Sequence, residues 1–193
     1  PTKRFDPEQG WTFHGHEWLG ANMVSRIFRN MRLPLDHKLD YVRKMVRLHL
    51  RPVSLTKEEV TDSAVRRLIF DAGPDIDDLM LLCESDITTK NPRKMARYIE
   101  GYEYLKERIA EVNESDRLRL WQPPITGDVI MRVFGITPSR EVGLIKTAVR
   151  EAILDGELPN EFAPAFARMI EEAEKIGLKP RMTLQEYQNQ SSP

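Results

Sequence analysis

The segment Pro34-Leu-Asp-His-Lys-Leu-Asp-Tyr-Val-Arg-Lys-Met-Val-Arg-Leu-His-Leu-Arg-Pro52 decides the fold class of this 193-residue chain. Its apolar residues recur at the three- and four-residue spacing of one buried helix face: Leu39, Val42, Val46 and Leu50. Proline tends to end a helix before it, so the two prolines bracket the segment. The spacing therefore predicts a helix between them.

Helical spacing continues on both sides of this segment. Upstream, the pattern recurs at Val24, Ile27, Phe28 and Met31. Downstream, polar residues or prolines stand where helices should begin, at Thr61, Gly73-Pro74-Asp75, Asn91-Pro92, Thr126, Thr137-Pro138 and Asn160. No strand-like alternation bounded by hairpin signals appears. We therefore predict an all-α fold.

The stretch Arg119-Leu-Trp-Gln-Pro-Pro-Ile125 has the composition of a domain boundary. It divides a multi-helix bundle over residues 1–118 from a smaller C-terminal helical module over residues 119–178. Residues 179–193 are polar, and we expect a frayed, disordered tail there. The chain does not begin with Met, which leads us to expect a piece of a longer protein.

Composition excludes several classes of protein. Hydrophobic residues make up 40% and charged residues 31%, which favours a globular chain over a disordered one. No apolar run is long enough to cross a membrane, and no signal peptide is visible. Cys83 is the single cysteine, so an internal disulfide is excluded and a cytoplasmic location is expected. Cys83 follows an apolar run, which favours a buried, inert thiol.

Charge is unevenly distributed although the net charge is only −1. Residues 22–51 hold eight Lys/Arg against two Asp/Glu, whereas residues 57–86 hold three against nine. The two blocks can pair within the molecule, which charge alone slightly favours. A basic stripe can also follow the phosphates of a nucleic acid.

Two histidines stand close together in Trp11-Thr-Phe-His-Gly-His-Glu-Trp-Leu-Gly-Ala21, and His49 lies in another predicted helix. A histidine on an apolar helix face is usually a hydrogen-bonded core residue. His16, His49 and Asp86 could alternatively form a divalent-metal site from separate helices. His14 cannot share a helix face with His16, and we expect it to bond locally or face solvent.

Other catalytic motifs are rejected or absent. Asp75 and Asp77 form a D-x-D, but they follow a proline at a helix start, where acids are favoured electrostatically. No glycine-rich phosphate loop or nucleophile elbow occurs, and one cysteine cannot supply a zinc finger. Tyr98, Tyr102, Tyr104 and Trp121 could stack on bases, but helical spacing favours ordinary packing.

Six segments, taken in order, carry a resemblance to a known family. The segments are 11–21, Val46-Arg-Leu-His-Leu-Arg-Pro52, Ser63-Ala-Val-Arg-Arg67, Asp78-Leu-Met-Leu-Leu-Cys-Glu-Ser-Asp86, Thr126-Gly-Asp-Val-Ile-Met131 and Ala152-Ile-Leu-Asp-Gly-Glu-Leu-Pro-Asn160. Together they resemble the C-terminal half of bacterial CCA-adding tRNA nucleotidyltransferases of the poly(A) polymerase family. More narrowly, they resemble Bacteroidetes-type enzymes that carry an HD phosphohydrolase-like domain.

The resemblance implies that residues 1–118 are a truncated HD-like domain. His16 and His49 match later histidines of the HD motif, and Asp86 matches its final aspartate. The first histidine and the His-Asp doublet of that motif are absent, so we do not expect these residues alone to retain a divalent metal. The catalytic head, with its Mg²⁺ and its CTP and ATP sites, is absent too, and we assign no catalytic residue to this chain.

The remaining part resembles the body and tail that hold tRNA, so tRNA is the expected partner. A binder of RNA shape needs spaced cations for phosphates. The candidates are Arg26, Arg29, Arg43, Lys44, Arg47, Arg51, Arg140 and Lys146. Where the family often has Gly-Pro, this chain has Ser139-Arg140, and Arg140 is a possible substitute. Two alternatives stay open: an HD-type metal-dependent phosphohydrolase domain and a non-catalytic helical interaction module.

Overall fold

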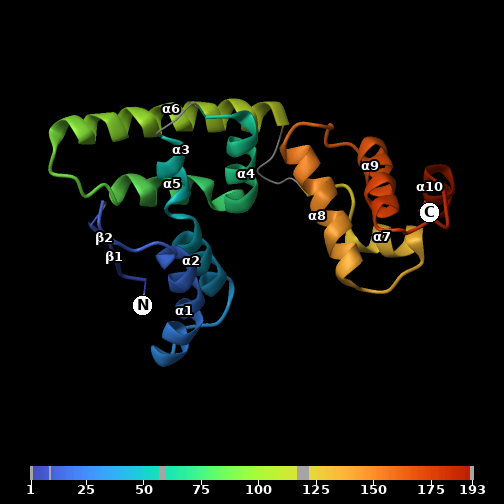
Figure 1. Ribbon diagram of the computed structural model, residues 1–193, viewed down its shortest axis with the longest axis horizontal. Helices are drawn as coiled ribbons and strands as arrows, with labels where there is room; N and C mark the ends of the chain where they lie inside the picture. The colour runs from blue at the N-terminus through green and yellow to red at the C-terminus, as the bar shows by residue number, and fades with distance from the viewer. Residues whose placement is uncertain (1, 9, 57–59, 117–121, 192–193) are drawn as a thin grey trace. The chain divides into compact units, whose positions relative to one another are not determined.

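A computed structural model describes residues 2–8, 10–56, 60–116 and 122–191 of the chain. The chain forms two compact units, residues 1–119 and 120–193 (Figure 1). The first unit contains β1 (Arg4–Asp6), β2 (Gly10–Thr12), α1 (His16–Asn30), α2 (His37–Leu48), α3 (Arg51–Leu55), α4 (Asp62–Ala72), the 3₁₀ turn η1 (Gly73–Asp75), α5 (Ile76–Ser85) and α6 (Pro92–Asp116). The second contains α7 (Gly127–Phe134), α8 (Arg140–Leu154), α9 (Phe162–Lys175) and α10 (Leu184–Ser191).

The predicted all-α class is confirmed, with one small exception. β1 and β2 form an antiparallel hairpin in which Phe5 pairs with Trp11. The expectation that no hairpin occurs is therefore wrong at this point. Both strands are three residues long and neither has a buried face, so they lack the apolar alternation that marks longer strands. Among the described residues, no helix is both long and apolar enough to cross a membrane.

The core of the first unit forms beneath the long helix α6, which runs along α3, α4 and α5 (Figure 1). Helices α1 and α2 pack against each other and extend from this layer. The most deeply buried side chains come from α4, α5 and α6: Val65, Leu68, Ile69, Ile76, Leu79 and Leu105. Burial of apolar area of this kind is the main stabilising contribution to such a unit.

Local capping explains where several helices begin and end. The Thr61 hydroxyl accepts a hydrogen bond from the Ala64 amide at 3.3 Å, and Thr126 caps α7 in the same way. Gly135 ends α7 with φ at 65°, a left-handed conformation that favours glycine. The starts at Thr61 and Thr126 agree with the predicted positions.

The second unit packs α7, α8 and α9 around a shared core that includes Ile130, Val149 and Met169. Residues 179–193, predicted as a disordered tail, instead include α10. Tyr187 of α10 stacks on Phe162 with ring centroids 5.7 Å apart. Aromatic packing thus holds a segment whose polar composition alone suggested disorder.

Candidate functional site

Two of the three predicted metal ligands meet in the first unit. His16 begins α1 and His49 follows the end of α2, and their Nε2 atoms lie 3.2 Å apart. The ring centroids are 5.2 Å apart, with an angle of 60° between the planes. The fold therefore brings together two imidazoles that are separated by 33 positions in the sequence.

Backbone contacts orient both rings of this histidine pair. Each Nδ1 lies 2.8 Å from a carbonyl oxygen, that of Phe13 for His16 and that of Val46 for His49. A carbonyl oxygen can only accept, so Nδ1 is the donor in each of these contacts, and the two Nε2 atoms face each other. Histidines that ligate metals have the same arrangement, with the far ring nitrogen donating to an oxygen.

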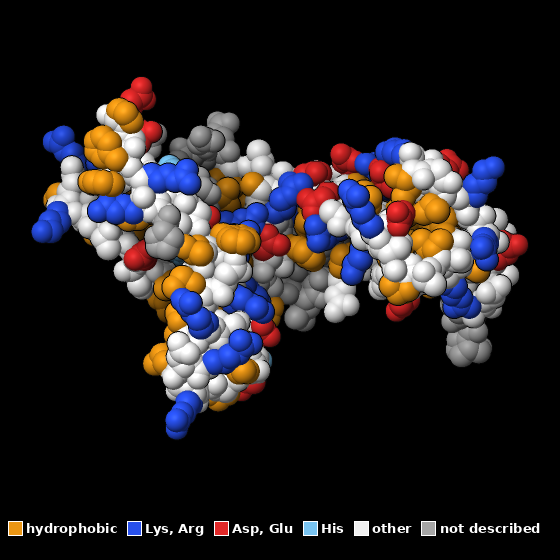
Figure 2. Space-filling model, turned by 60° about the horizontal axis from the view of Figure 1, so that its bottom comes forward, with side chains coloured by type: hydrophobic (Ala, Val, Ile, Leu, Met, Phe, Trp, Pro, Cys, Tyr) orange, Lys and Arg blue, Asp and Glu red, His pale blue; other side chains and the backbone are white. Residues whose placement is uncertain are grey.

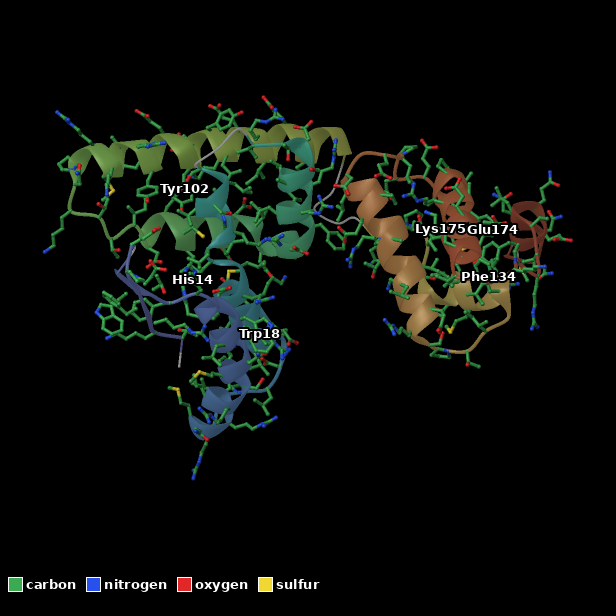
Figure 3. All side chains as sticks on the ribbon, in the orientation of Figure 1. His14, Trp18, Tyr102, Phe134, Glu174 and Lys175 are labelled. Carbon is green, nitrogen blue, oxygen red and sulfur yellow. The ribbon has the colours of Figure 1, made fainter. Side chains whose placement is uncertain are left out.

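Asp86 lies beside the histidine pair without completing a metal site. Asp86 and His49 line the same two cavities, of about 530 and 290 Å³. In the first of these, the Tyr41 hydroxyl donates to Asp78 at 3.0 Å, which raises the pKa of Tyr41. Within the described ranges, no three His, Cys, Asp or Glu side chains form a group that could hold a metal ion. His14 is exposed, beside the start of α1 (Figure 3).

Part of the predicted RNA-binding set is engaged inside the molecule. Lys44 Nζ lies 2.7 Å from Asp75 Oδ2 and 3.1 Å from the Ala72 carbonyl oxygen. Arg51 pairs with Asp71, and both Lys44 and Arg51 are half-buried. These contacts link the basic block to the acidic block, as charge complementarity predicted.

The other predicted cations face outward. Arg43 is exposed, and its one ion-pair partner among the described residues is Asp40 on the same helix, at 2.8 Å. The remaining candidates are exposed and form no ion pair with any described residue: Arg26, Arg29, Arg47, Arg140 and Lys146. Figure 2 shows Lys and Arg side chains over the α1–α2 part of the first unit. Cations held apart from carboxylates remain available for phosphate.

Comparison with known proteins gives two relatives. One is an A-adding tRNA nucleotidyltransferase from Deinococcus radiodurans, 27% identical over 173 residues, which are 86% of this chain and 38% of the relative. The other is a CC-adding tRNA nucleotidyltransferase from Thermus thermophilus, 27% identical over 170 residues, which are 86% of this chain and 36% of the relative. The chain is similar to part of these tRNA nucleotidyltransferases. No protein-family model and no solved structure matches it.

The chain spans less than two fifths of the length of the curated relatives it matches. The similarity agrees with the nucleotidyltransferase resemblance of the six sequence segments.

The structure also places side chains that were set aside as packing residues. Cys83 is buried and donates from Sγ to the His49 carbonyl oxygen at 3.0 Å. Burial raises the pKa of the Cys83 thiol to about 12, so the thiol stays protonated and inert. Tyr102 is buried on α6 (Figure 3), and burial raises the pKa of its phenol. Tyr104 is half exposed, and Trp121 lies outside the described residues.

Two cations on α6 were absent from the predicted set. Lys94 and Arg97 line a cavity with Thr56 and Tyr98. Their spacing of three positions on one helix face was visible in the sequence, but they lie outside the basic block on which the prediction concentrated.

Proposed function

We propose that this chain is the tRNA-binding portion of a tRNA nucleotidyltransferase and has no nucleotide-adding activity by itself. The whole protein would add CCA, or its CC or A part, to the 3′ end of tRNA from CTP and ATP. Its head domain would supply the Mg²⁺-dependent chemistry. The observation that carries the proposal is the similarity to A-adding and CC-adding enzymes over 86% of the chain.

The surface chemistry supports this proposal. Arg26 and Arg29 on α1 and Arg47 on α2 are exposed and make no ion pair within the described structure. Arg47 also lines an open cavity of about 760 Å³ together with the half-buried Lys44 and Arg51. Such cations can contact phosphates without reading bases, which suits a partner recognised by its shape.

Binding of tRNA to the purified chain at several salt concentrations tests the proposal. Double-stranded RNA of unrelated shape and single-stranded RNA of equal length serve as competitors. Affinity for tRNA should exceed affinity for either competitor and should fall steeply with salt, by about one unit of log–log slope for each phosphate contact. Equal affinity for all three RNAs at each salt concentration would contradict recognition of tRNA.

Substitutions of single and paired cations test whether the exposed arginines of α1 and α2 bind the tRNA. Arg29→Gln combined with Arg47→Gln should weaken tRNA binding more than Arg43→Gln, because Arg43 is already paired with Asp40. Lys175→Gln in α9 is a matched control, since Lys175 pairs with Glu172 at 2.7 Å. If all of these variants lose affinity equally, general charge rather than this surface holds the RNA.

A second candidate function rests on the histidine pair. Two nitrogens bound to one tetrahedral zinc at about 2.0–2.1 Å would lie about 3.3 Å apart, close to the 3.2 Å between His16 Nε2 and His49 Nε2. The pair fits two ligands of a divalent metal, which would activate water in an HD-type phosphohydrolase. Asp86 lines the neighbouring cavities and is the candidate third ligand, although no three-ligand group forms among the described residues.

Zinc titration separates this function from the first. His16→Ala and His49→Ala should each abolish zinc binding by the chain, whereas His37→Ala, on an exposed histidine at the start of α2, should not. Unchanged zinc affinity in both His16→Ala and His49→Ala would show that these histidines are not metal ligands. Binding of tRNA should survive all three substitutions, because none of them changes an exposed arginine or lysine.

A further inference from the structure

A basic pocket lies where the end of α3 meets the first half of α6. Its volume is about 240 Å³, and its lining is Thr56, Lys94, Arg97 and Tyr98. Among the described residues, this lining holds two cations and no carboxylate. The hydroxyl of Thr56 already donates to the Val53 carbonyl oxygen at 2.9 Å, so the hydrogen-bond donors available to a ligand are Lys94, Arg97 and Tyr98.

These two cations are not used to hold the fold. Lys94 and Arg97 are exposed, and neither side chain forms an ion pair within the described part of the chain. Further along the same helix, Lys106 pairs with Glu84 and Arg108 pairs with Asp62 and Glu111. Two like charges three positions apart on one helix face repel each other, which makes an anion between them favourable.

Close helix packing holds the wall of this pocket in place. A Cβ on Gly101 of α6 would lie 2.7 Å from Thr56 Cβ and 3.2 Å from the Thr56 carbonyl oxygen. The absence of a side chain at Gly101 therefore lets the end of α3 lie directly against α6, side by side as Figure 1 shows. Thr56, which contributes to the pocket lining, is therefore held against α6 by close packing.

Tyr98 is shared with the neighbouring cavity of about 290 Å³, which His49, Asp86, Thr88 and Thr89 also line. The lining of this neighbouring cavity also includes the apolar side chains Leu50, Val53 and Ile87. Tyr98 thus stands between the basic pocket and a second cavity of mixed polarity.

We propose that Lys94, Arg97 and Tyr98 form a binding site for a phosphate group, carried either by an RNA backbone or by a free nucleotide. Arginine offers paired donors that suit phosphate oxygens, and lysine adds a point charge. A backbone phosphate would extend the tRNA contact proposed above, whereas a free nucleotide would occupy the site independently of it. The proposal does not depend on the histidine pair.

The test uses the full chain and three probes: inorganic phosphate, AMP and tRNA. The variant is Lys94→Gln with Arg97→Gln. The matched control is Lys90→Gln with Arg93→Gln, which removes the same charge from exposed positions in the same segment that do not line the pocket. Nuclear magnetic resonance follows the amides of residues 94–101 during titration, and fluorescence anisotropy measures tRNA affinity. Circular dichroism checks that both variants fold.

A free-nucleotide site predicts that phosphate and AMP shift these amides in the native chain and in the control. The 94/97 variant should bind both at least tenfold more weakly, with tRNA affinity unchanged. An RNA-backbone site predicts at least a threefold loss of tRNA affinity in the 94/97 variant alone. This result would stand even if the Arg29 and Arg47 variants bound tRNA normally, so the two proposals can fail separately. Equal losses in variant and control, or no effect of any probe, would overturn the phosphate site.

Discussion

Replacing Gly101 by alanine should destabilise the first unit, although alanine is the better helix former. In an open helix position, Gly→Ala gains about 0.5–1 kcal/mol. At Gly101 the new Cβ would lie 2.7 Å from Thr56 Cβ, nearer than carbon atoms approach in folded proteins. Both atoms are attached directly to backbone, so no side-chain rotation can separate them. Overpacking costs about 1–3 kcal/mol, which leaves a net loss of up to about 2.5 kcal/mol after the helix gain.

Gly143 in α8 provides the matched comparison. A Cβ there would have no neighbour within 4 Å, so Gly143→Ala should stabilise the second unit by about 0.5–1 kcal/mol. Scanning calorimetry of the full chain measures both changes, at about 2–4 °C per kcal/mol for this chain length. Peptide-level hydrogen exchange assigns each change to its unit. Gly101→Ala should therefore lower the unfolding temperature of the first unit, whereas Gly143→Ala should raise that of the second.

The result that refutes this reasoning is a gain in stability at Gly101 equal to that at Gly143. It would mean that the end of α3 does not press on α6 at Thr56. A double-mutant cycle adds a second check. Thr56→Gly removes the opposing Cβ, so Gly101→Ala should cost less in that background, with a coupling of about 0.5 kcal/mol or more expected for residues in contact. Zero coupling would leave the predicted clash without support.

Three further predictions concern charge and backbone conformation. Hydrogen bonds from the Thr183 amide and hydroxyl lower the pKa of Glu186, so their contribution to the stability of α10 should be complete above the ordinary glutamate pKa. As pH falls below that value, the amides of α10 should lose protection from hydrogen exchange, and Glu186→Gln should abolish this pH dependence. Arg32, which follows α1, has φ at 56°, a left-handed conformation that is strained for arginine. Arg32→Gly should therefore raise the free energy of unfolding, measured by urea titration, by about 1 kcal/mol. A lower free energy of unfolding would show that the arginine side chain stabilises the fold by more than the backbone strain costs. Asp75→Asn should lower the unfolding free energy by about 1 kcal/mol, because Lys44 loses a half-buried partner, and Lys44→Met with Asp75→Asn should recover part of that loss.

The sequence predicted most helices because their signals are local. A threonine cap and the amide it accepts from lie three residues apart, as at Thr61 and Thr126, so both partners appear in one short window. The β1–β2 hairpin and α10 were missed for the opposite reason. The hairpin has no buried face to impose alternation, and α10 depends on Tyr187 packing against Phe162, 25 positions away along the chain.

The candidate sites also divide into features visible in the sequence and features that depend on contacts between distant residues. Residue types identified His16, His49 and the basic block, but spacing could not tell which groups would meet. Only the tertiary structure placed the two Nε2 atoms in contact and left Asp86 on a cavity wall beside them. The pocket at Lys94 and Arg97 could not be predicted from the sequence, because Thr56 joins its lining only through the packing of α3 on α6.

Residue spacing and capping signals alone predicted a helical chain, most of its helix starts and its resemblance to tRNA nucleotidyltransferases. The tertiary structure decided which cations are neutralised, as Lys44 is by Asp75, and which remain available for phosphate, as Arg47 and Arg97 do. The difference follows from the sequence separation between the interacting residues. Helix formation and capping act between residues three or four positions apart, whereas ion pairs and pockets join side chains that only the packing of separate helices brings within a few ångströms.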